Sequence, residues 1–179
     1  YQLYLVENKE HSGERYNSLM SILNQCSTSI GRRLCKERLL YPIVDPAELE
    51  NRYAMISAFQ KIYQEEPLYQ QCYPHLKKIL DVEKLHRKMN LSLLTPYGFY
   101  TMHTSYCFLQ KVTDILKEGL ADVYDEYLHA SSSDGVIQGL KTFQEAYTKI
   151  FNVNELQKYS LTNMTTSIFN KGIFPEIDA

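Results

Sequence analysis

Residues 29–52 read SIGRRLCKERLLYPIVDPAELENR and contain two helix patterns separated by a break. The first pattern has to end before Pro42, because the residue that precedes a proline avoids the helical conformation. The second starts at Asp45 in an order typical of a helix N-terminus: aspartate as the cap, proline at the first helical position and glutamate in the first turn. Ser27 or Thr28 can cap the first helix. The stretch therefore predicts two consecutive helices with a short link between them.

Gly31 lies inside the first of these helices, although alanine is about 1 kcal/mol more favourable than glycine in a helix interior. Ile30 and Leu34 lie one turn apart on one side of the helix, and Cys35 and Leu39 lie on another. A helix that is apolar on two flanks is predicted to be buried between neighbours. Because Gly31 falls between these flanks and has no Cβ, we expect another backbone to approach it closely.

The basic residues beside this glycine fall mainly on the remaining side of the helix, which is predicted to face solvent. A second basic group follows His86 in another predicted helix, where charged residues spaced four apart are typical of an ordinary surface. Phosphate contacts from either group are expected to be weak. The candidate weak DNA contacts are Arg32, Arg33, Lys36, Arg87 and Lys88.

Further helix starts follow along the chain, each marked by a capping residue or a proline. The helix that starts at the Thr95-Pro96 pair is predicted to be the longest, and Gly119 is its expected C-cap. The other predicted starts are Asn17, Pro67 and Asp81.

Residues 131–135, SSSDG, have the composition of a loop, and residues 136–151 predict one more helix. The tail from residue 152 to residue 179 is rich in Asn, Thr, Gly and Pro and is predicted to be extended or irregular. No segment alternates convincingly with the period of two that marks a strand. The predicted fold class is therefore all-α, a multi-helix bundle with a partly irregular C-terminal tail.

The composition is that of an ordinary globular protein, with 44% hydrophobic and 22% charged residues among 179. The net charge of -2 argues against a dedicated DNA-binding domain, which is usually clearly basic. Four scattered cysteines predict reduced thiols in an intracellular protein. No apolar run approaches the roughly 18 residues of a membrane span. The chain begins at Tyr1 rather than at a methionine, which predicts a segment of a longer protein.

The sequence contains no constellation typical of catalysis: no phosphate-binding glycine loop, no HExxH and no nucleophile elbow. An acidic segment with a histidine has ligand types that suit a divalent metal, but a solvated helix face explains it better. Its residues are Asp122, Asp125, Glu126 and His129. The sequence therefore assigns no catalytic, cofactor-binding or metal-ligating residue.

Several blocks of the sequence occur in an order that is similar to one protein family. Residues 17–24 (NSLMSILN), 28–34 (TSIGRRL) and 39–45 (LLYPIVD) resemble the start of the core domain of MutS-family mismatch-repair proteins. Residues 81–85 (DVEKL) resemble a later segment of that domain, and residues 169–178 (FNKGIFPEID) resemble the segment that leads into its inserted clamp domain. The structural residues that the resemblance carries over are Gly31, Leu34, Pro42 and Asp45.

The resemblance implies a non-catalytic domain, a structural and allosteric relay that links DNA-reading, clamp and ATPase domains. It implies an extended entry segment over residues 1–16, a helical core or lever over 17–165 and an exit segment toward the clamp over 166–179. ATP and magnesium are implied for the full-length parent and not for this chain. The implied partners are mismatched double-stranded DNA through the parent, other domains of the same chain and a second subunit of a homo- or heterodimer. The implied location is intracellular, in the cytoplasm or nucleoid or in a eukaryotic nucleus, without a membrane.

Two other functions fit the same residues less well. One is a helical protein–protein interaction module unrelated to DNA repair, an adaptor whose exposed tyrosines form the partner surface. The other is a small helical enzyme that uses the acidic segment around Asp125. A phosphate-binding loop downstream of this chain distinguishes the relay from both.

The resemblance also predicts where apolar surface is left uncovered. In the MutS family, helices that return after the clamp complete the core, so this chain is expected to lack partners for its longest helix. The stripe expected to be exposed is Phe99, Met102, Tyr106 and Leu109.

DNA affinity is predicted to be weak and insensitive to mismatches, because the chain is mildly acidic and the mismatch-reading domain of the family lies outside it. Binding should fall steeply as salt is added, since it depends on phosphate contacts. A titration with matched and mismatched duplexes near physiological salt tests this. Tight, mismatch-selective binding contradicts it.

Overall fold

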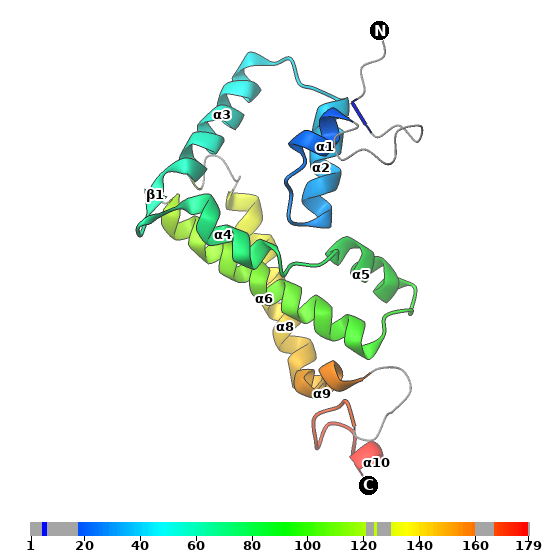
Figure 1. Ribbon diagram of the computed structural model, residues 1–179. Helices are drawn as coiled ribbons and strands as arrows, with labels where there is room; N and C mark the ends of the chain where they lie inside the picture. Colours follow the sequence, from blue (N-terminus) through cyan, green and yellow to red (C-terminus); the bar gives the residue numbers. More distant parts are fainter. Residues whose placement is uncertain (1–4, 7–17, 121–123, 125–129, 160–166, 179) are drawn as a thin grey trace. The chain divides into compact units, whose positions relative to one another are not determined.

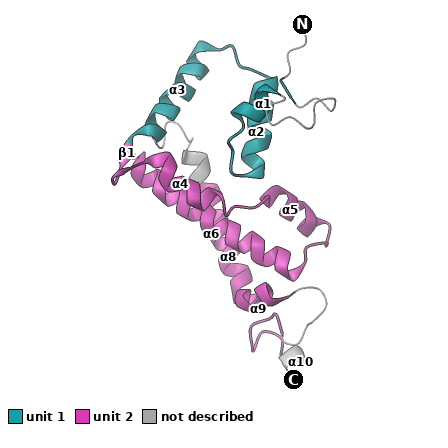
Figure 2. Cartoon of the chain, viewed as in Figure 1, with its two compact units in different colours: residues 1–61 teal, residues 62–179 magenta. Residues whose placement is uncertain are grey.

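The computed structural model describes residues 5–6, 18–120, 124, 130–159 and 167–178. It divides into two compact units, residues 1–61 and residues 62–179 (Figure 2). The described part is mostly helical, which confirms the predicted all-α class, and its only sheet pairs two strands of two residues each. The predicted segment boundaries at residues 16/17 and 165/166 lie outside the described residues and stay predictions.

The first unit contains three described helices, coloured blue to cyan in Figure 1: α1 (Leu19–Leu23), α2 (Ser29–Leu40) and α3 (Pro46–Gln60). Ser18 caps α1, one residue after the predicted Asn17. The Ser18 hydroxyl accepts the Ser21 N–H and the Ser21 hydroxyl accepts the Ser18 N–H, each at 3.2 Å. The prediction for α2 is confirmed, since the Thr28 hydroxyl accepts the Gly31 N–H at 3.0 Å.

The prediction that α2 is buried between neighbours is wrong. None of its described side chains is fully buried, and Leu34 is 44% exposed. The described side chains of this unit that are fully buried are only Ser18, Met20 and Ala58. Ile30, Cys35 and Leu39 are half-buried, so within the described residues the apolar flanks of α2 are covered only in part. The exposed large apolar side chains of this unit are Leu19, Ile22, Leu23, Leu34, Leu40, Tyr41, Val44, Tyr53 and Ile56.

The second unit is built around one long helix. Its elements are β1 (Ile62–Tyr63), β2 (Glu66–Pro67), α4 (Leu68–Leu76), α5 (Val82–Asn90), α6 (Pro96–Gly119), α8 (Ala130–Ile150), α9 (Val153–Lys158) and α10 (Pro175–Asp178). The two strands form an antiparallel hairpin, and the turn residues Gln64 and Glu65 both have positive φ. Figure 1 shows α6 running through the unit, and it contacts α4, α5, α8 and α9.

Helix α6 starts as predicted and supplies much of the core, but its C-cap is Leu120, because Gly119, the predicted cap, is its last helical residue. The Thr95 hydroxyl accepts the Gly98 N–H at 3.0 Å, and proline occupies the first turn. Met102 and Ser105 are completely buried, and the Ser105 hydroxyl accepts the Leu80 N–H at 3.1 Å. Full burial of a side chain such as Met102 contributes roughly 1.5–3 kcal/mol.

The expected exposed stripe on this helix is largely covered by the chain itself, which corrects that prediction. Met102 and Tyr106 are buried and Phe99 is half-buried, whereas Leu109 is 40% exposed. The covering side chains come from later helices, such as Tyr147 of α8, whose ring meets Phe99 edge-on with centroids 4.9 Å apart. Large apolar side chains are exposed in both units, and α1 to α3 with their links carry nine of them.

Residues 131–135 belong to the first turns of α8, so the prediction of a loop there is wrong. Serine and glycine lower helix propensity, but propensity is a small bias that a 21-residue helix with tertiary contacts overrides. The predicted irregular tail is also more ordered than expected. Asn170 donates its side-chain amide to the carbonyls of Thr148 at 2.8 Å and Lys149 at 2.9 Å, and so satisfies the end of α8.

The closest approach at a glycine occurs at Gly119 rather than at Gly31. A Cβ at Gly119 would lie 2.4 Å from Cδ1 of Leu68, a fully buried side chain of α4. At Gly31 the nearest atoms are Oγ1 of Thr28 at 2.9 Å and Cβ of Cys26 at 3.3 Å, which belong to the preceding cap and link. The predicted approach of another backbone at Gly31 is therefore wrong.

These contacts predict different effects for the same substitution at three helical glycines. Gly119→Ala should lower the free energy of unfolding by roughly 1–3 kcal/mol, because it overpacks the contact with α4. Gly139→Ala should raise it by about 1 kcal/mol, because nothing lies within 4 Å of the new methyl group. Gly31→Ala should change it little, because the propensity gain is offset by crowding at the cap. Chemical denaturation of the three variants measures this, and a stabilised Gly119→Ala variant contradicts it.

Candidate functional site

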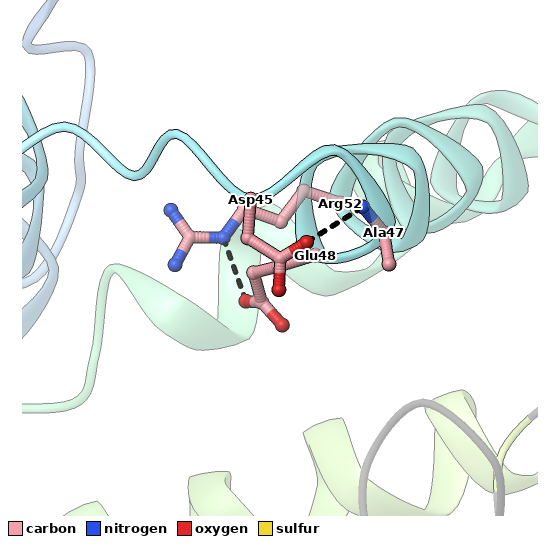
Figure 3. A network of polar contacts seen from close by, with 4 residues as sticks. All are labelled: Asp45, Ala47, Glu48 and Arg52. Carbon is pink, nitrogen blue, oxygen red and sulfur yellow. Dashed lines mark hydrogen bonds and ion pairs between the residues drawn. The ribbon is translucent and has the colours of Figure 1, made fainter.

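The start of α3 is the part of the predicted structural motif that makes defined contacts. Figure 3 shows the Asp45 carboxylate accepting the Ala47 N–H at 3.0 Å, and Arg52 Nε pairing with Glu48 Oε1 at 3.1 Å. A helix cap of this kind stabilises by about 1 kcal/mol, whereas an exposed ion pair one turn apart contributes only about 0.3–0.5 kcal/mol. Pro42 and Asp45 are both exposed, so their role is to end one helix and start the next.

The residues predicted to make weak DNA contacts are all on the surface, in two groups. Arg32, Arg33 and Lys36 are exposed on α2, and Arg87 and Lys88 are exposed on α5. The two groups belong to different compact units, so the structure defines no single surface that contains both. Their contact with DNA stays a prediction.

A cluster of lysines and aromatic rings between α4 and α6 was missed by sequence reasoning. Lys78 and Lys111 place their Nζ atoms 4.9 Å and 5.2 Å from the centre of the Phe108 ring. Lys77 Nζ lies 4.3 Å from the centre of the Tyr73 ring. The only sequence signal was the pair Lys77-Lys78 after an aromatic residue, because Lys111 joins the cluster through the packing of two helices.

A chain of polar side chains joins α6 to α8 inside the second unit. His103 Nδ1 and the Tyr147 hydroxyl are 2.7 Å apart, and His103 Nε2 is 3.5 Å from the sulfur of Cys107. The Gln144 amide donates to the same sulfur at 3.8 Å, and the Gln110 amide donates to the Gln144 carbonyl oxygen. Because Gln144 and Tyr147 are buried, these bonds also fix the register of the two helices.

Burial favours the neutral forms of His103 and Tyr147 in this hydrogen-bonded network. Burial lowers the pKa of His103 below its ordinary value and raises the pKa of Tyr147 above its ordinary value. Burial also raises the pKa of Tyr106, which shares a hydrogen bond with His86, to about 12. The hydroxyl of a protonated tyrosine can donate to His103 Nδ1 or accept from it, so either neutral tautomer of His103 satisfies this contact.

The described residues offer no metal site and no membrane span. No group of three or more His, Cys, Asp or Glu side chains in the described part is close enough to hold a metal ion. The acidic segment weighed from the sequence, Asp122, Asp125, Glu126 and His129, lies outside the described residues. No helix in the described ranges has the length and apolar character needed to cross a bilayer.

The helical class and the order of its blocks correspond to one known family. Residues 1–171 match the family described as MutS domain III. The chain therefore belongs to the MutS domain III family, which confirms the resemblance found in the sequence.

Individual relatives give the same result. The chain is 25% identical over 182 residues to a protein of Acanthamoeba polyphaga mimivirus named as a DNA mismatch repair mutS homolog, a match that covers 99% of the chain and 15% of that protein. It is 23% identical over 167 residues to DNA mismatch repair protein MutS of Alkaliphilus metalliredigens, covering 93% of the chain and 18% of the relative. It is 35% identical over 115 residues to a mitochondrial mutS homolog of Sarcophyton glaucum, covering 60% of the chain and 11% of that protein.

The chain thus spans less than a fifth of the length of each of these relatives. No solved structure matches it significantly. The family supports a role in DNA mismatch repair.

Because partial burial lowers the pKa of His103, the stability of the fold is predicted to fall on acidification. The unfolded chain binds a proton at this histidine as the pH drops through about 6.5, whereas the folded chain binds it only at a lower pH. The contribution of neutral His103 to the free energy of unfolding is therefore fully present above about pH 6.5. It is lost as the pH falls toward the pKa of His103 in the folded chain. His103→Gln should show a smaller drop in Tm between pH 7.5 and pH 5.5 than the unsubstituted chain. Gln110→Leu is the control, because it disturbs the same network of polar side chains without removing a titrating group. The prediction is contradicted if Tm depends on pH equally in His103→Gln and in the unsubstituted protein.

Proposed function

We propose that this chain is the core, or lever, domain of a MutS-type DNA mismatch repair protein, and that it acts there as a non-catalytic structural and allosteric relay. The observation that carries the proposal is the family match, which extends over residues 1–171. The relay links DNA-reading, clamp and ATPase domains that belong to the parent protein.

The architecture of the second unit suits a relay. Helix α6 has 24 residues and is therefore about 36 Å long at 1.5 Å per residue. It is packed against α4, α5, α8 and α9, and hydrogen bonds between buried side chains tie it to α8. A long helix held on several sides moves as a rigid element, so a displacement at one end reaches the other.

The proposal also covers the location, activity, cofactors and partners of the parent protein. The parent is proposed to be an intracellular, DNA-dependent ATPase that uses magnesium, binds mismatched double-stranded DNA and works as a homo- or heterodimer. No residue described in this chain is assigned to ATP, to magnesium or to catalysis.

The exposed apolar residues of α1 to α3 favour a partner surface, which is the observation behind the adaptor alternative. We propose that other domains of the same parent chain cover this surface. An adaptor unrelated to DNA repair has no support from the family to which the chain belongs.

The relay is tested in the full-length protein by a variant that should weaken the coupling between DNA binding and ATP turnover without abolishing either activity. Gln144→Leu removes the acceptor for Gln110 and a donor to Cys107, and so loosens α8 from α6. It should reduce the change in ATP turnover that mismatched DNA produces, while basal turnover and DNA affinity remain. Lys141→Gln, an exposed position on the same helix, is the matched control.

Two results contradict the proposal. One is a Gln144→Leu protein that keeps full coupling although its Tm shows that the α6–α8 contact is weakened. The other is ATP turnover by the 179-residue chain alone that survives rigorous purification.

A further inference from the structure

Cys26, in the link between α1 and α2, packs against the turn of α2 that contains Gly31. A Cβ placed at Gly31 would lie 3.3 Å from Cβ of Cys26 and 3.6 Å from its sulfur. The first of these distances is shorter than an ordinary van der Waals contact. The missing Cβ of Gly31 therefore leaves the space in which the Cys26 side chain lies.

Cys35 lies one turn further along the same side of α2. It follows Gly31 by four residues, a spacing at which the Cβ atoms of a helix are about 5–6 Å apart. Helical side chains also lean toward the N-terminus of their helix and so cover the preceding turn. The Cys35 side chain thus leans toward the turn against which Cys26 packs, and the two thiols are close enough to share a hydrogen bond.

The surroundings of this thiol pair leave it open to small reagents. Burial, followed by the charge and the hydrogen bond of Cys35, raises the pKa of the Cys26 thiol, and the positive charge of Arg32 opposes that shift. Both side chains are only half-buried, whereas the Cys72 side chain is 2% exposed. A small oxidant in solution therefore reaches Cys26 and Cys35 more easily than Cys72.

The four cysteines of the chain are free thiols in this structure. Two thiols can be joined without a large backbone movement when their Cβ atoms approach to about 3.5–4.5 Å, and thiols within hydrogen-bonding reach are near that range. We propose that Cys26 and Cys35 are a redox modification site, which forms an intramolecular disulfide when the protein meets hydrogen peroxide.

The reaction needs only the two thiols and the peroxide. One thiol loses its proton, and its sulfur attacks an oxygen of the peroxide, whose O–O bond breaks to give a sulfenic acid and hydroxide. The second sulfur then attacks the sulfenic sulfur, so that an S–S bond forms as the S–O bond breaks. The hydroxide released in each step takes up the proton of one thiol. The two thiols together lose two electrons and two protons, and the peroxide is reduced to two molecules of water.

The disulfide ties the link before α2 to the middle of that helix. Residues 26–35 become a closed loop that contains the Thr28 cap and Gly31. Closing a loop restricts the unfolded chain, so a disulfide that fits the native backbone stabilises the fold. The site lies within the first compact unit and does not depend on the proposed relay role.

The test treats the folded 179-residue chain with hydrogen peroxide, blocks the remaining thiols with iodoacetamide and maps tryptic peptides by mass spectrometry. Trypsin cleaves after Arg32 and Arg33, so the disulfide joins peptide 16–32 to peptide 34–36. The joined peptides should be the main cross-linked product, and dithiothreitol should separate them. The oxidised chain should have a Tm higher by roughly 5 °C or more than the reduced chain.

Two variants assign these effects to the proposed pair. Cys26→Ser and Cys35→Ser should each abolish both the joined peptides and the rise in Tm. Cys107→Ser is the matched control, because it replaces another half-buried cysteine in the other unit, and it should keep both effects. Circular dichroism of the reduced proteins establishes that each variant is folded.

Any of three results overturns the proposal. One is peroxide oxidation of the folded chain that leaves peptides 16–32 and 34–36 separate. Another is a cross-link between these peptides that forms only between two molecules or only in urea, because the native fold then does not bring the thiols together. The third is a Tm that falls on formation of the disulfide, because the bond then strains the native backbone. None of these results affects the coupling measurement in the full-length protein.

Discussion

The close packing of α6 is the constraint on which the second unit depends. Four other helices contact this one helix, so its side chains must leave room for neighbours on several sides. The tightest point is Gly119, where the missing Cβ admits the buried side chain of Leu68 from α4. Further along, Met102 and Ser105 leave no exposed surface at all. An interior packed to this density adjusts little, so one methyl group added at Gly119 is expected to destabilise the contact with α4.

Polar groups complete this packing instead of interrupting it. Burying His103, Gln144 and Tyr147 is costly unless each finds a partner, and together they satisfy one another across α6 and α8. The desolvation that keeps the histidine and tyrosine neutral is the same burial that makes their hydrogen bonds effective. A core joined in this way has one preferred register, and a single register is what a relay between distant domains requires.

The two units differ in how far they satisfy their own apolar surface. The second unit covers most of the α6 stripe with its own chain, while α1 to α3 leave many large apolar side chains exposed. The chain spans less than a fifth of its relatives in the MutS family, so the proposed parent has ample further sequence to cover them.

The sequence alone determined what depends on a few neighbouring residues: the all-α class, the caps Thr28, Asp45, Asp81 and Thr95, and the family resemblance. Those features are local, because a cap is a hydrogen bond over two or three residues and a helix pattern repeats every turn. The tertiary structure decided which glycine is closely packed, which apolar stripe is covered and which lysines meet one ring. Each of these depends on atoms brought together from distant positions, such as Leu68 with Gly119 and Lys78 with Lys111, and no spacing along the chain encodes such a distance. The loop predicted over residues 131–135 is wrong because helix propensity is only a small bias, and these residues belong to the 21-residue helix α8.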